Sequence, residues 1–128
     1  MAFMKNGADV LVVEDDAQLN ELVGAYVKIA GFGYRHALDG TTAISEAQAH
    51  HPKLIILDIM LPDIDGFEVC RRLKSDQATR AIPVLMLTAL SQEESRRKGM
   101  ELGASGYMTK PFDPDKLIAA IQEQTNHH

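Results

Sequence analysis

Carboxylic acids and one lysine follow apolar runs at three separated points of this 128-residue chain. The carboxyl ends of the strands in an open α/β sheet meet at one edge, where ligands bind, so side chains at such places can share a site. Carboxylates brought together repel one another unless a cation lies among them. Mg²⁺ prefers oxygen ligands from carboxylates, waters and phosphate groups. These residue types predict a site for a divalent cation and a phosphoryl group, and the residues are Glu14, Asp15, Asp16, Asp58 and Lys110.

Asp58 is the candidate nucleophile of this site. It follows the apolar residues 54–57, so a strand would fix the carboxylate in position and still expose it to a phosphoryl donor. A single aspartate at a strand end is more often a solvated terminator than a reactive group. The neighbouring acids Glu14 and Asp15 favour the reactive interpretation, because three carboxylates together require a cation.

Asp16 competes with Asp15 as a metal ligand, since the acidic run is three residues long and the residues alone do not fix which of them faces the metal. Aspartate is also a common N-cap, because its carboxylate accepts hydrogen bonds from the first free amides of a helix. We interpret Asp16 as this N-cap, and the residues alone leave open which acids of the run bind the metal.

Apolar runs and helical periodicity alternate along the chain and predict five strand–helix repeats. Short connections between such repeats imply right-handed crossovers and a doubly wound parallel sheet with helices on both faces. The expected strands are residues 10–13, 34–37, 53–57, 82–87 and 107–108. The first helix is expected to use the apolar residues Leu19, Leu22, Val23, Tyr26, Val27 and Ala30.

Two later helices carry their own signals. Residues 92–102 have helical propensity but few apolar side chains, which predicts a weakly held helix. The last helix is expected to start at Asp113, as N-cap, with Pro114 in the first helical position.

Composition bounds the class of protein. The formal net charge of −5 and the absence of a basic block argue against direct nucleic-acid binding. No apolar stretch reaches the roughly 18 residues that a membrane span needs. The first residues contain no signal-peptide core, so the cytoplasm is the expected compartment. Cys70 is the single cysteine, which excludes an internal disulfide. Residues 8–125 are expected to form one domain, with residues 1–7 and 126–128 as terminal extensions.

Four motifs in this order resemble those of a known family. They are LVVED (residues 11–15), LDIMLP (57–62), LTA (87–89) and TKPF (109–112). Together they resemble the receiver domain of bacterial two-component response regulators, over nearly the whole chain. The resemblance implies a flavodoxin-like, five-stranded sheet in the order 2-1-3-4-5. It also implies a phosphorelay in which a histidine kinase or a histidine phosphotransfer protein phosphorylates an aspartate.

The resemblance assigns roles to the metal site. Asp58 would be the phosphoacceptor, and Asp15 and Asp58 would bind Mg²⁺ directly. The backbone carbonyl of Met60 would be a third protein ligand, and Glu14 would act through a water.

The resemblance also assigns a switch. Thr88 would hydrogen-bond a phosphoryl oxygen, and Tyr107 would turn inward as Thr88 moves. Lys110 would pair with the phosphoryl group, and its bond to Pro111 can be cis, as proline allows. Without the resemblance, we would interpret Thr88 as a threonine whose hydroxyl bonds nearby backbone, Tyr107 as a core aromatic residue and Lys110 as a surface lysine.

The signal is expected to leave through the fourth helix, the fifth strand and the fifth helix, toward a downstream protein or a fused output domain. The domain would be a switch that assists its own phosphorylation and dephosphorylation, not an enzyme acting on other substrates. Receivers of winged-helix transcription factors usually carry paired aspartates and basic residues on this face. This chain has Ser105, Gly106 and the uncharged residues 117–121 there, which argues against a charged dimer of that type.

Three other functions remain to be weighed. A receiver-like interaction module that works without phosphorylation would typically have lost the acidic pair, the aspartate or the lysine, and this chain keeps all of them. A haloacid-dehalogenase-type phosphatase needs a second carboxylate where Met60 stands. A flavodoxin-like cofactor binder needs a glycine- and hydroxyl-rich loop where residues 14–16 are acidic.

Overall fold

The structure is a computed structural model that describes residues 9–126. The predicted extension 1–7, residue 8 of the predicted domain and residues 127–128 of the second predicted extension lie outside this range. Within it, parallel strands form one five-stranded sheet in the order β2-β1-β3-β4-β5, which confirms the expected topology. The strands are β1 (Asp9–Val13), β2 (Gly33–Ala37), β3 (Leu54–Leu57), β4 (Val84–Thr88) and β5 (Gly106–Thr109). β4 begins at Val84, two residues later than predicted, so that Pro83 lies just before the strand. It ends one residue later than predicted, so that Thr88 lies within it.

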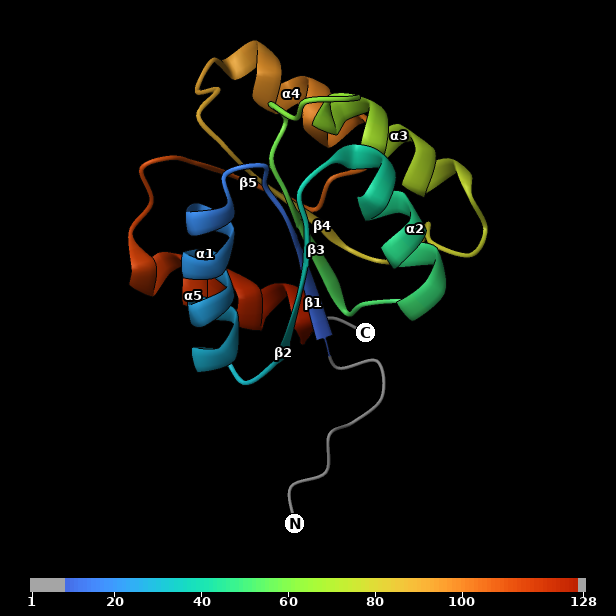
Figure 1. Ribbon diagram of the computed structural model, residues 1–128. Coiled ribbons are helices and arrows are strands. Elements are labelled where there is room, and N and C mark those ends of the chain that lie inside the picture. Colours follow the sequence, from blue (N-terminus) through green and yellow to red (C-terminus); the bar gives the residue numbers. More distant parts are fainter. Residues whose placement is uncertain (1–8, 127–128) are drawn as a thin grey trace.

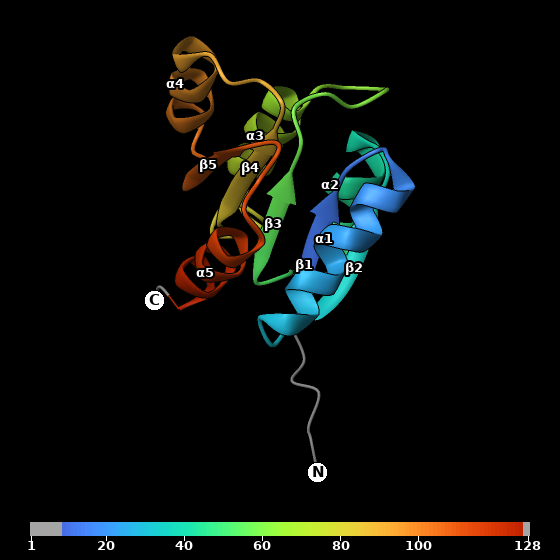
Figure 2. The same cartoon turned by 90° about the vertical axis from the view of Figure 1, so that its left-hand side faces the viewer.

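Helices cover both faces of the sheet (Figures 1 and 2). On one face lie α1 (Ala17–Ile29) and α5 (Pro114–Thr125), and on the other lie α2 (Gly40–His50), α3 (Gly66–Ser75) and α4 (Glu93–Glu101). In this part of the chain, none of the helices has the length and apolar character that crossing a membrane requires.

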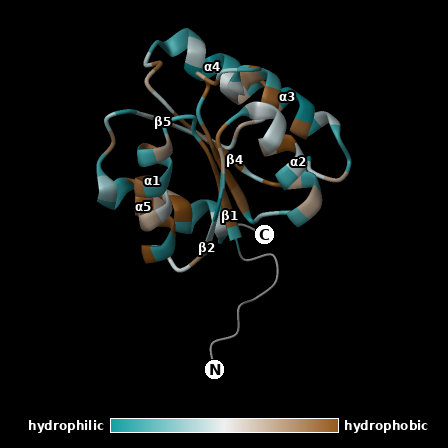
Figure 3. Ribbon diagram, viewed as in Figure 1, coloured by the Kyte–Doolittle hydropathy of each residue, from teal (hydrophilic) through white to brown (hydrophobic). Residues whose placement is uncertain are grey.

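The sheet separates two apolar clusters. Successive residues of a strand point to opposite faces, so Leu11 and Val13 join the cluster beneath α2 and α3, whereas Val10 and Val12 join the cluster beneath α1 and α5. Figure 3 shows the apolar residues concentrated in the central strands and the polar residues on the outer helix surfaces. Strands buried on both faces are held firmly, and they fix the residues that follow their carboxyl ends.

The buried face of α1 matches the predicted one except at Leu22, since the other five predicted residues lie in or against the apolar cluster. The helix forms as expected, but its buried residues are Asn20, Val23, Gly24 and Val27, and Leu22 is 47% exposed. The ring of Tyr34, from β2, fills the space beside Gly24, where an added Cβ would lie 2.5 Å from the ring. Apolar spacing alone did not indicate the close fit of this ring or the inward amide of Asn20.

The loop between β3 and α3 is tied to the start of α2. Both carboxylate oxygens of Asp63 accept backbone hydrogen bonds there, from Gly40 N at 2.8 Å and from Thr41 N at 2.9 Å. The Thr41 hydroxyl donates a further bond to Asp63 at 2.6 Å. Asp39 caps the same helix through Thr42 N. Free amides and the helix dipole favour negative charge at this end, and Asp63 thereby holds the loop that follows the candidate nucleophile.

α4 is held weakly. Of its nine residues, Gly99 alone is buried. In the described part of the chain, its N-cap residue Gln92 makes no side-chain hydrogen bond to the helix. Little buried apolar surface gives a helix a low local free energy of opening.

We predict that the backbone amides of α4 exchange with solvent faster than those of α3, measured by hydrogen–deuterium exchange with mass spectrometry at neutral pH. The two helices are similar in length, but α3 buries Gly66, Val69, Cys70 and Leu73. Equal protection of the two helices would contradict this assignment of stability.

We predict that Asp63→Ala lowers the free energy of unfolding at pH 7 by about 1 kcal/mol, the typical contribution of a helix-capping side chain. The hydroxyl of Thr41, followed by the amides of Gly40 and Thr41, holds the pKa of Asp63 below its ordinary value of 3.8. A carboxyl whose pKa is lower in the folded state stabilises the fold above its unfolded pKa and loses that contribution as the pH falls. The difference between variant and wild type should therefore narrow from about pH 4 toward pH 2.

The measurement is urea unfolding at each pH. The matched variant Thr41→Val removes one donor and keeps the amides, so it should reproduce part of the effect at pH 7. A gap that stays constant down to low pH would show that the charge of Asp63 is not what stabilises the loop.

Candidate functional site

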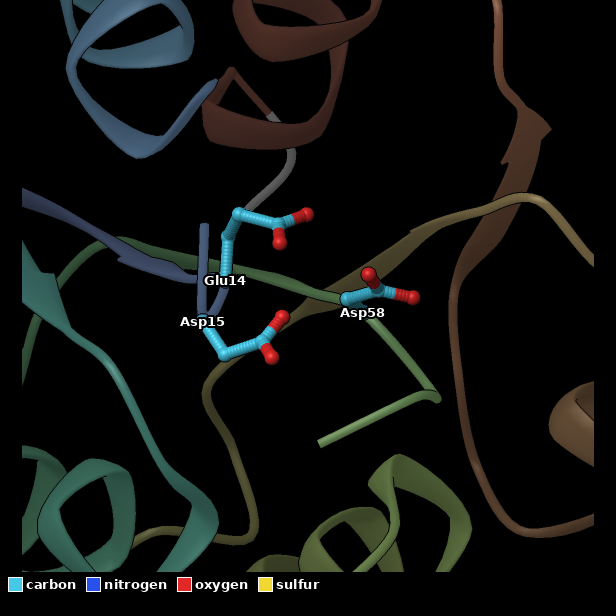
Figure 4. A group of neighbouring side chains, drawn as sticks. All are labelled: Glu14, Asp15 and Asp58. Atoms are coloured by element: carbon cyan, nitrogen blue, oxygen red, sulfur yellow. The ribbon is translucent and has the colours of Figure 1, made fainter. Parts of the chain in front are cut away.

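The structure brings three carboxylates from two distant parts of the chain together at the carboxyl edge of the sheet. Glu14 and Asp15 directly follow β1, and Asp58 directly follows the adjacent strand β3. One carboxylate oxygen from each lies within 4.8 Å of the others, so the three could hold one metal ion. Figure 4 shows the three carboxyl groups around a common space.

Lys110 completes this cluster from the end of β5. Its Nζ donates to Glu14 Oε1 at 2.5 Å and to Asp58 Oδ2 at 2.7 Å. Both acids are 5% exposed, so the ammonium group neutralises charge that is largely removed from water. The Lys110 amide bonds Thr88 O at 2.8 Å, and the peptide bond to Pro111 is cis, as the sequence allowed.

These contacts shift the ionisation of all three groups. Burial by itself raises the pKa of Asp58, but hydrogen bonds from Lys110 and from the Met60 amide outweigh it and hold the pKa below its ordinary value. Burial lowers the pKa of Lys110, and its two carboxylate partners more than restore it. For Glu14, burial dominates and its pKa is raised, with Lys110 and the Asp16 amide offsetting only part of the effect. Asp58 is therefore ionised at neutral pH, as a nucleophilic carboxylate must be.

Backbone contacts fix Asp58 in place. Its amide donates to Val13 O at 3.0 Å, and its Oδ1 accepts from Met60 N at 3.2 Å. The start of α3 lies close to the backbone of Asp58, because a Cβ on Gly66 would lie 2.3 Å from Asp58 O. Glycine is needed there for the backbone to come so close.

Asp15 and Asp16 separate into different roles. Asp16 Oδ1 accepts from Gln18 N and Leu19 N, which makes Asp16 the N-cap of α1, as predicted. Its own amide donates to Glu14 Oε2 at 2.9 Å and orients that carboxylate. Asp15 instead is exposed and contributes an oxygen to the possible metal group. The geometry thus favours Asp15 over Asp16 as a ligand, the alternative that the sequence left open.

Thr88 and Tyr107 are connected through Leu90. The buried Thr88 hydroxyl lies near enough to Asp58 to lower its pKa further, and it accepts a long hydrogen bond from Leu90 N at 3.4 Å. The hydroxyl of the half-buried Tyr107 donates to Leu90 O at 2.7 Å. The Tyr107 ring lies against α4, where a Cβ on Gly99 would be 3.5 Å away. A path of contacts therefore leads from the candidate nucleophile to the weakly held helix.

An open depression of about 610 Å³ gives access to the acidic cluster. When all are ionised, three carboxylates and one ammonium group leave a net charge of two negative, which a divalent cation would balance. Small Ala89 leaves room beside Asp58 for an incoming group. The lining residues are Glu14, Asp15, Asp16, Leu19, Asp58, Ile59, Met60, Leu61, Pro62, Asp65, Ala89 and Lys110.

Two residues that support this site were not identified from the sequence. Asp63 anchors the loop that follows Asp58, and nothing in its neighbourhood along the chain distinguishes it from a solvated loop aspartate. Asn20 is 1% exposed and hydrogen-bonds the backbone beside Glu14. Its signal was a polar residue three and seven positions before Val23 and Val27, on the face of α1 that is buried.

The chain matches the family model of the response regulator receiver domain over residues 10–122. It is 42% identical over 113 residues to the DNA-binding dual master transcriptional regulator RpaA of Synechocystis, covering 88% of this chain and 47% of that protein. It is 43% identical over 113 residues to the phosphate regulon transcriptional regulatory protein PhoB of Escherichia coli, covering 88% of this chain and 49% of that protein. The chain thus spans about half the length of these curated relatives.

Solved structures agree with the sequence comparison. The chemotaxis response regulator CheY4 of Vibrio cholerae superposes with a TM-score of 0.85 at 32% identity, covering 91% of this chain and 98% of that one. The family match spans both the acidic cluster after β1 and Lys110 after β5. The chain belongs to the response regulator receiver domains, the phosphoacceptor domains of two-component signalling.

Proposed function

We propose that Asp58 accepts a phosphoryl group from the phosphohistidine of a histidine kinase or histidine phosphotransfer protein. The observation that carries this proposal is an ionised carboxylate at the base of an open depression, 2.7 Å from a lysine ammonium group. In the transfer, an oxygen of Asp58 forms a bond to phosphorus while the phosphorus–nitrogen bond of the donor breaks. The electron pair of that bond leaves with the imidazole nitrogen. We propose the cytoplasm as the compartment of this domain, which is consistent with its family.

Glu14, Asp15 and Asp58 are the residues that would hold Mg²⁺, with the Met60 carbonyl as a further ligand and Glu14 acting through a water. The donor set fits this ion, because its carboxylate oxygens lie within 4.8 Å of one another and Mg²⁺ prefers oxygen ligands. Receiver domains bind Mg²⁺ at an acidic cluster of this kind. When bound, the ion neutralises charge on the transferring phosphoryl group.

Lys110 provides the second positive charge of the reaction. Its ammonium group holds Asp58 Oδ2 before transfer, and the same three donors can pair with a phosphoryl oxygen afterwards. The group needs to move little, since the phosphoryl group is attached to the carboxylate that Lys110 already contacts. Groups of the domain itself thereby assist both the phosphorylation of Asp58 and the later hydrolysis of the phosphate.

The phosphoryl group would act on the rest of the domain through Thr88. A phosphoryl group adds negative charge and strong acceptor oxygens, which attract the Thr88 hydroxyl. Movement of Thr88 disturbs Leu90, and Leu90 O is the acceptor of the Tyr107 hydroxyl. The surface of α4, β5 and α5 would change with Tyr107, by a shift between conformations that exist before phosphorylation.

A downstream protein or a fused output domain would read this surface. The curated relatives RpaA and PhoB are transcriptional regulators about twice as long as this chain. Residues 8–125 are the domain we propose for this chain, and the family match lies within these bounds.

We predict that incubation with acetyl phosphate and Mg²⁺ adds one phosphoryl group to the wild type and none to Asp58→Asn, measured by intact mass. The variant keeps the size of the side chain but removes the nucleophilic oxygen. Asp65→Asn is the matched control: Asp65 lines the same depression, and asparagine still caps α3. It should be labelled like the wild type.

Labelling of Asp58→Asn would identify another acceptor. A folded wild type that binds Mg²⁺ and gains no mass would instead support the interaction module that works without phosphorylation.

We predict that Asp15→Asn weakens Mg²⁺ binding by at least about tenfold, measured by isothermal titration calorimetry, whereas Asp16→Asn causes a change several times smaller. Each variant removes one carboxylate from the acidic run. Asparagine preserves the N-cap of α1 at position 16 but offers a metal only a neutral amide oxygen at position 15. Equal losses in the two variants would mean that both acids bind the metal or that neither does.

A further inference from the structure

Asn20 is a buried polar residue on the apolar face of α1. It is 1% exposed and lies beside the carboxyl ends of β1 and β2. Its Nδ2 carries two hydrogens and lies within hydrogen-bond distance of three backbone carbonyls, so that one hydrogen is shared: Val12 O at 3.1 Å, Glu14 O at 3.0 Å and Ala37 O at 3.1 Å. One side chain therefore joins a helix to the carboxyl ends of two strands.

The orientation of this amide is fixed by its surroundings. Three carbonyl oxygens surround its nitrogen, and an amide turned by 180° would place its oxygen against them. At the other end, Asn20 Oδ1 accepts a hydrogen bond from the hydroxyl of Tyr34, which lies on β2. The Tyr34 ring fits against Gly24 and is held there. Both ends of the Asn20 side chain are thus satisfied, as a buried amide requires.

The contacts of Asn20 constrain the acidic residues themselves. Glu14 O belongs to the peptide that joins Glu14 to Asp15, so the hydrogen bond from Asn20 fixes the plane of that peptide. The amide on the other side of Glu14 is also fixed, by its bond to Ala37 O at 3.1 Å. With both peptides that flank Glu14 held, the direction in which its side chain leaves the backbone is set. The peptide after Asp15 is held in turn, because the Asp16 amide donates to Glu14 Oε2 at 2.9 Å, and the direction of the Asp15 side chain is thereby constrained as well.

We propose that Asn20, oriented by Tyr34, is a positioning residue that holds Glu14 and Asp15 in the arrangement that binds Mg²⁺. This inference rests on the Mg²⁺ site proposed above. Asn20 contacts the backbone of the ligands and not the metal, which is the way in which groups behind a metal site orient its ligands. A metal site held in advance binds more tightly, because less conformational freedom is lost on binding.

The test is the Mg²⁺ dissociation constant, measured by calorimetry on variants shown to be folded. Asn20→Leu keeps the approximate size and adds no charge, and it should weaken binding by about tenfold, as loss of such supporting groups typically does. Tyr34→Phe removes only the hydroxyl that orients Asn20, and it should weaken binding in the same direction by a smaller factor. It also provides the test if Asn20→Leu does not fold.

Val23→Ala is the matched control for stability. Val23 is buried on the same face of α1 and forms no hydrogen bond to the acidic loop through its side chain, so its truncation should lower thermal stability and leave Mg²⁺ affinity unchanged. Wild-type affinity in Asn20→Leu, or in Tyr34→Phe where only that variant folds, overturns the positioning role. So does an equal loss of affinity in Val23→Ala, which would reflect stability alone.

Asp15→Asn separates this inference from the proposed site. If Asp15→Asn loses affinity and the Asn20 and Tyr34 variants do not, the metal site stands and the positioning role falls. If Asp15→Asn binds like the wild type, the proposed site falls and the positioning role falls with it.

Discussion

The site depends on one interaction, in which two buried carboxylates share a single ammonium group. β1 and β3 are neighbours, with Val13 paired to Leu57, so the residues that follow them, Glu14 and Asp58, must lie side by side. Buried charges of the same sign are costly unless an opposite charge lies among them. Lys110 supplies that charge from the end of β5, two strands away from β3. The strand order thereby brings the two carboxylates and the lysine from three parts of the chain to one edge of the sheet.

That arrangement leaves the cluster short of positive charge, and this shortage is useful. One lysine neutralises one of three carboxylates, so the metal-free site repels further anions and attracts a divalent cation. With a cation present, the same lysine can follow the charge to an incoming phosphoryl group. A phosphoryl group on Asp58 would change this balance further, because it adds negative charge and acceptor oxygens beside Lys110.

The sequence was sufficient for the parts of this structure that depend on local pattern. Buried parallel strands have continuous apolar runs, so the sheet, its helices and the acids at its edge could be located. The N-caps Asp16 and Asp113 followed from local hydrogen-bond chemistry. The contacts of Asn20 with Ala37 and of Asp63 with Gly40 could not, because they join residues 17 and 23 positions apart. Which residues make these contacts depends on the rotation of α1 and on the path of a loop, and residues adjacent in the sequence do not determine either.

The firm and loose parts of the domain lie on opposite sides of Asp58. Toward β1, hydrogen bonds to backbone hold the acids, and moving them would break several bonds at once. Toward α4, attachment includes the packing of Gly99 against Tyr107 and the Lys98 ammonium group 4.5 Å from the Phe67 ring. A cation–π contact at an exposed site contributes about 0.5–1 kcal/mol, much less than the interaction of a new phosphate with charges a few ångströms away in a half-buried site. We therefore expect a charge change at Asp58 to deform the side toward α4 first, because more hydrogen bonds would have to break on the other side.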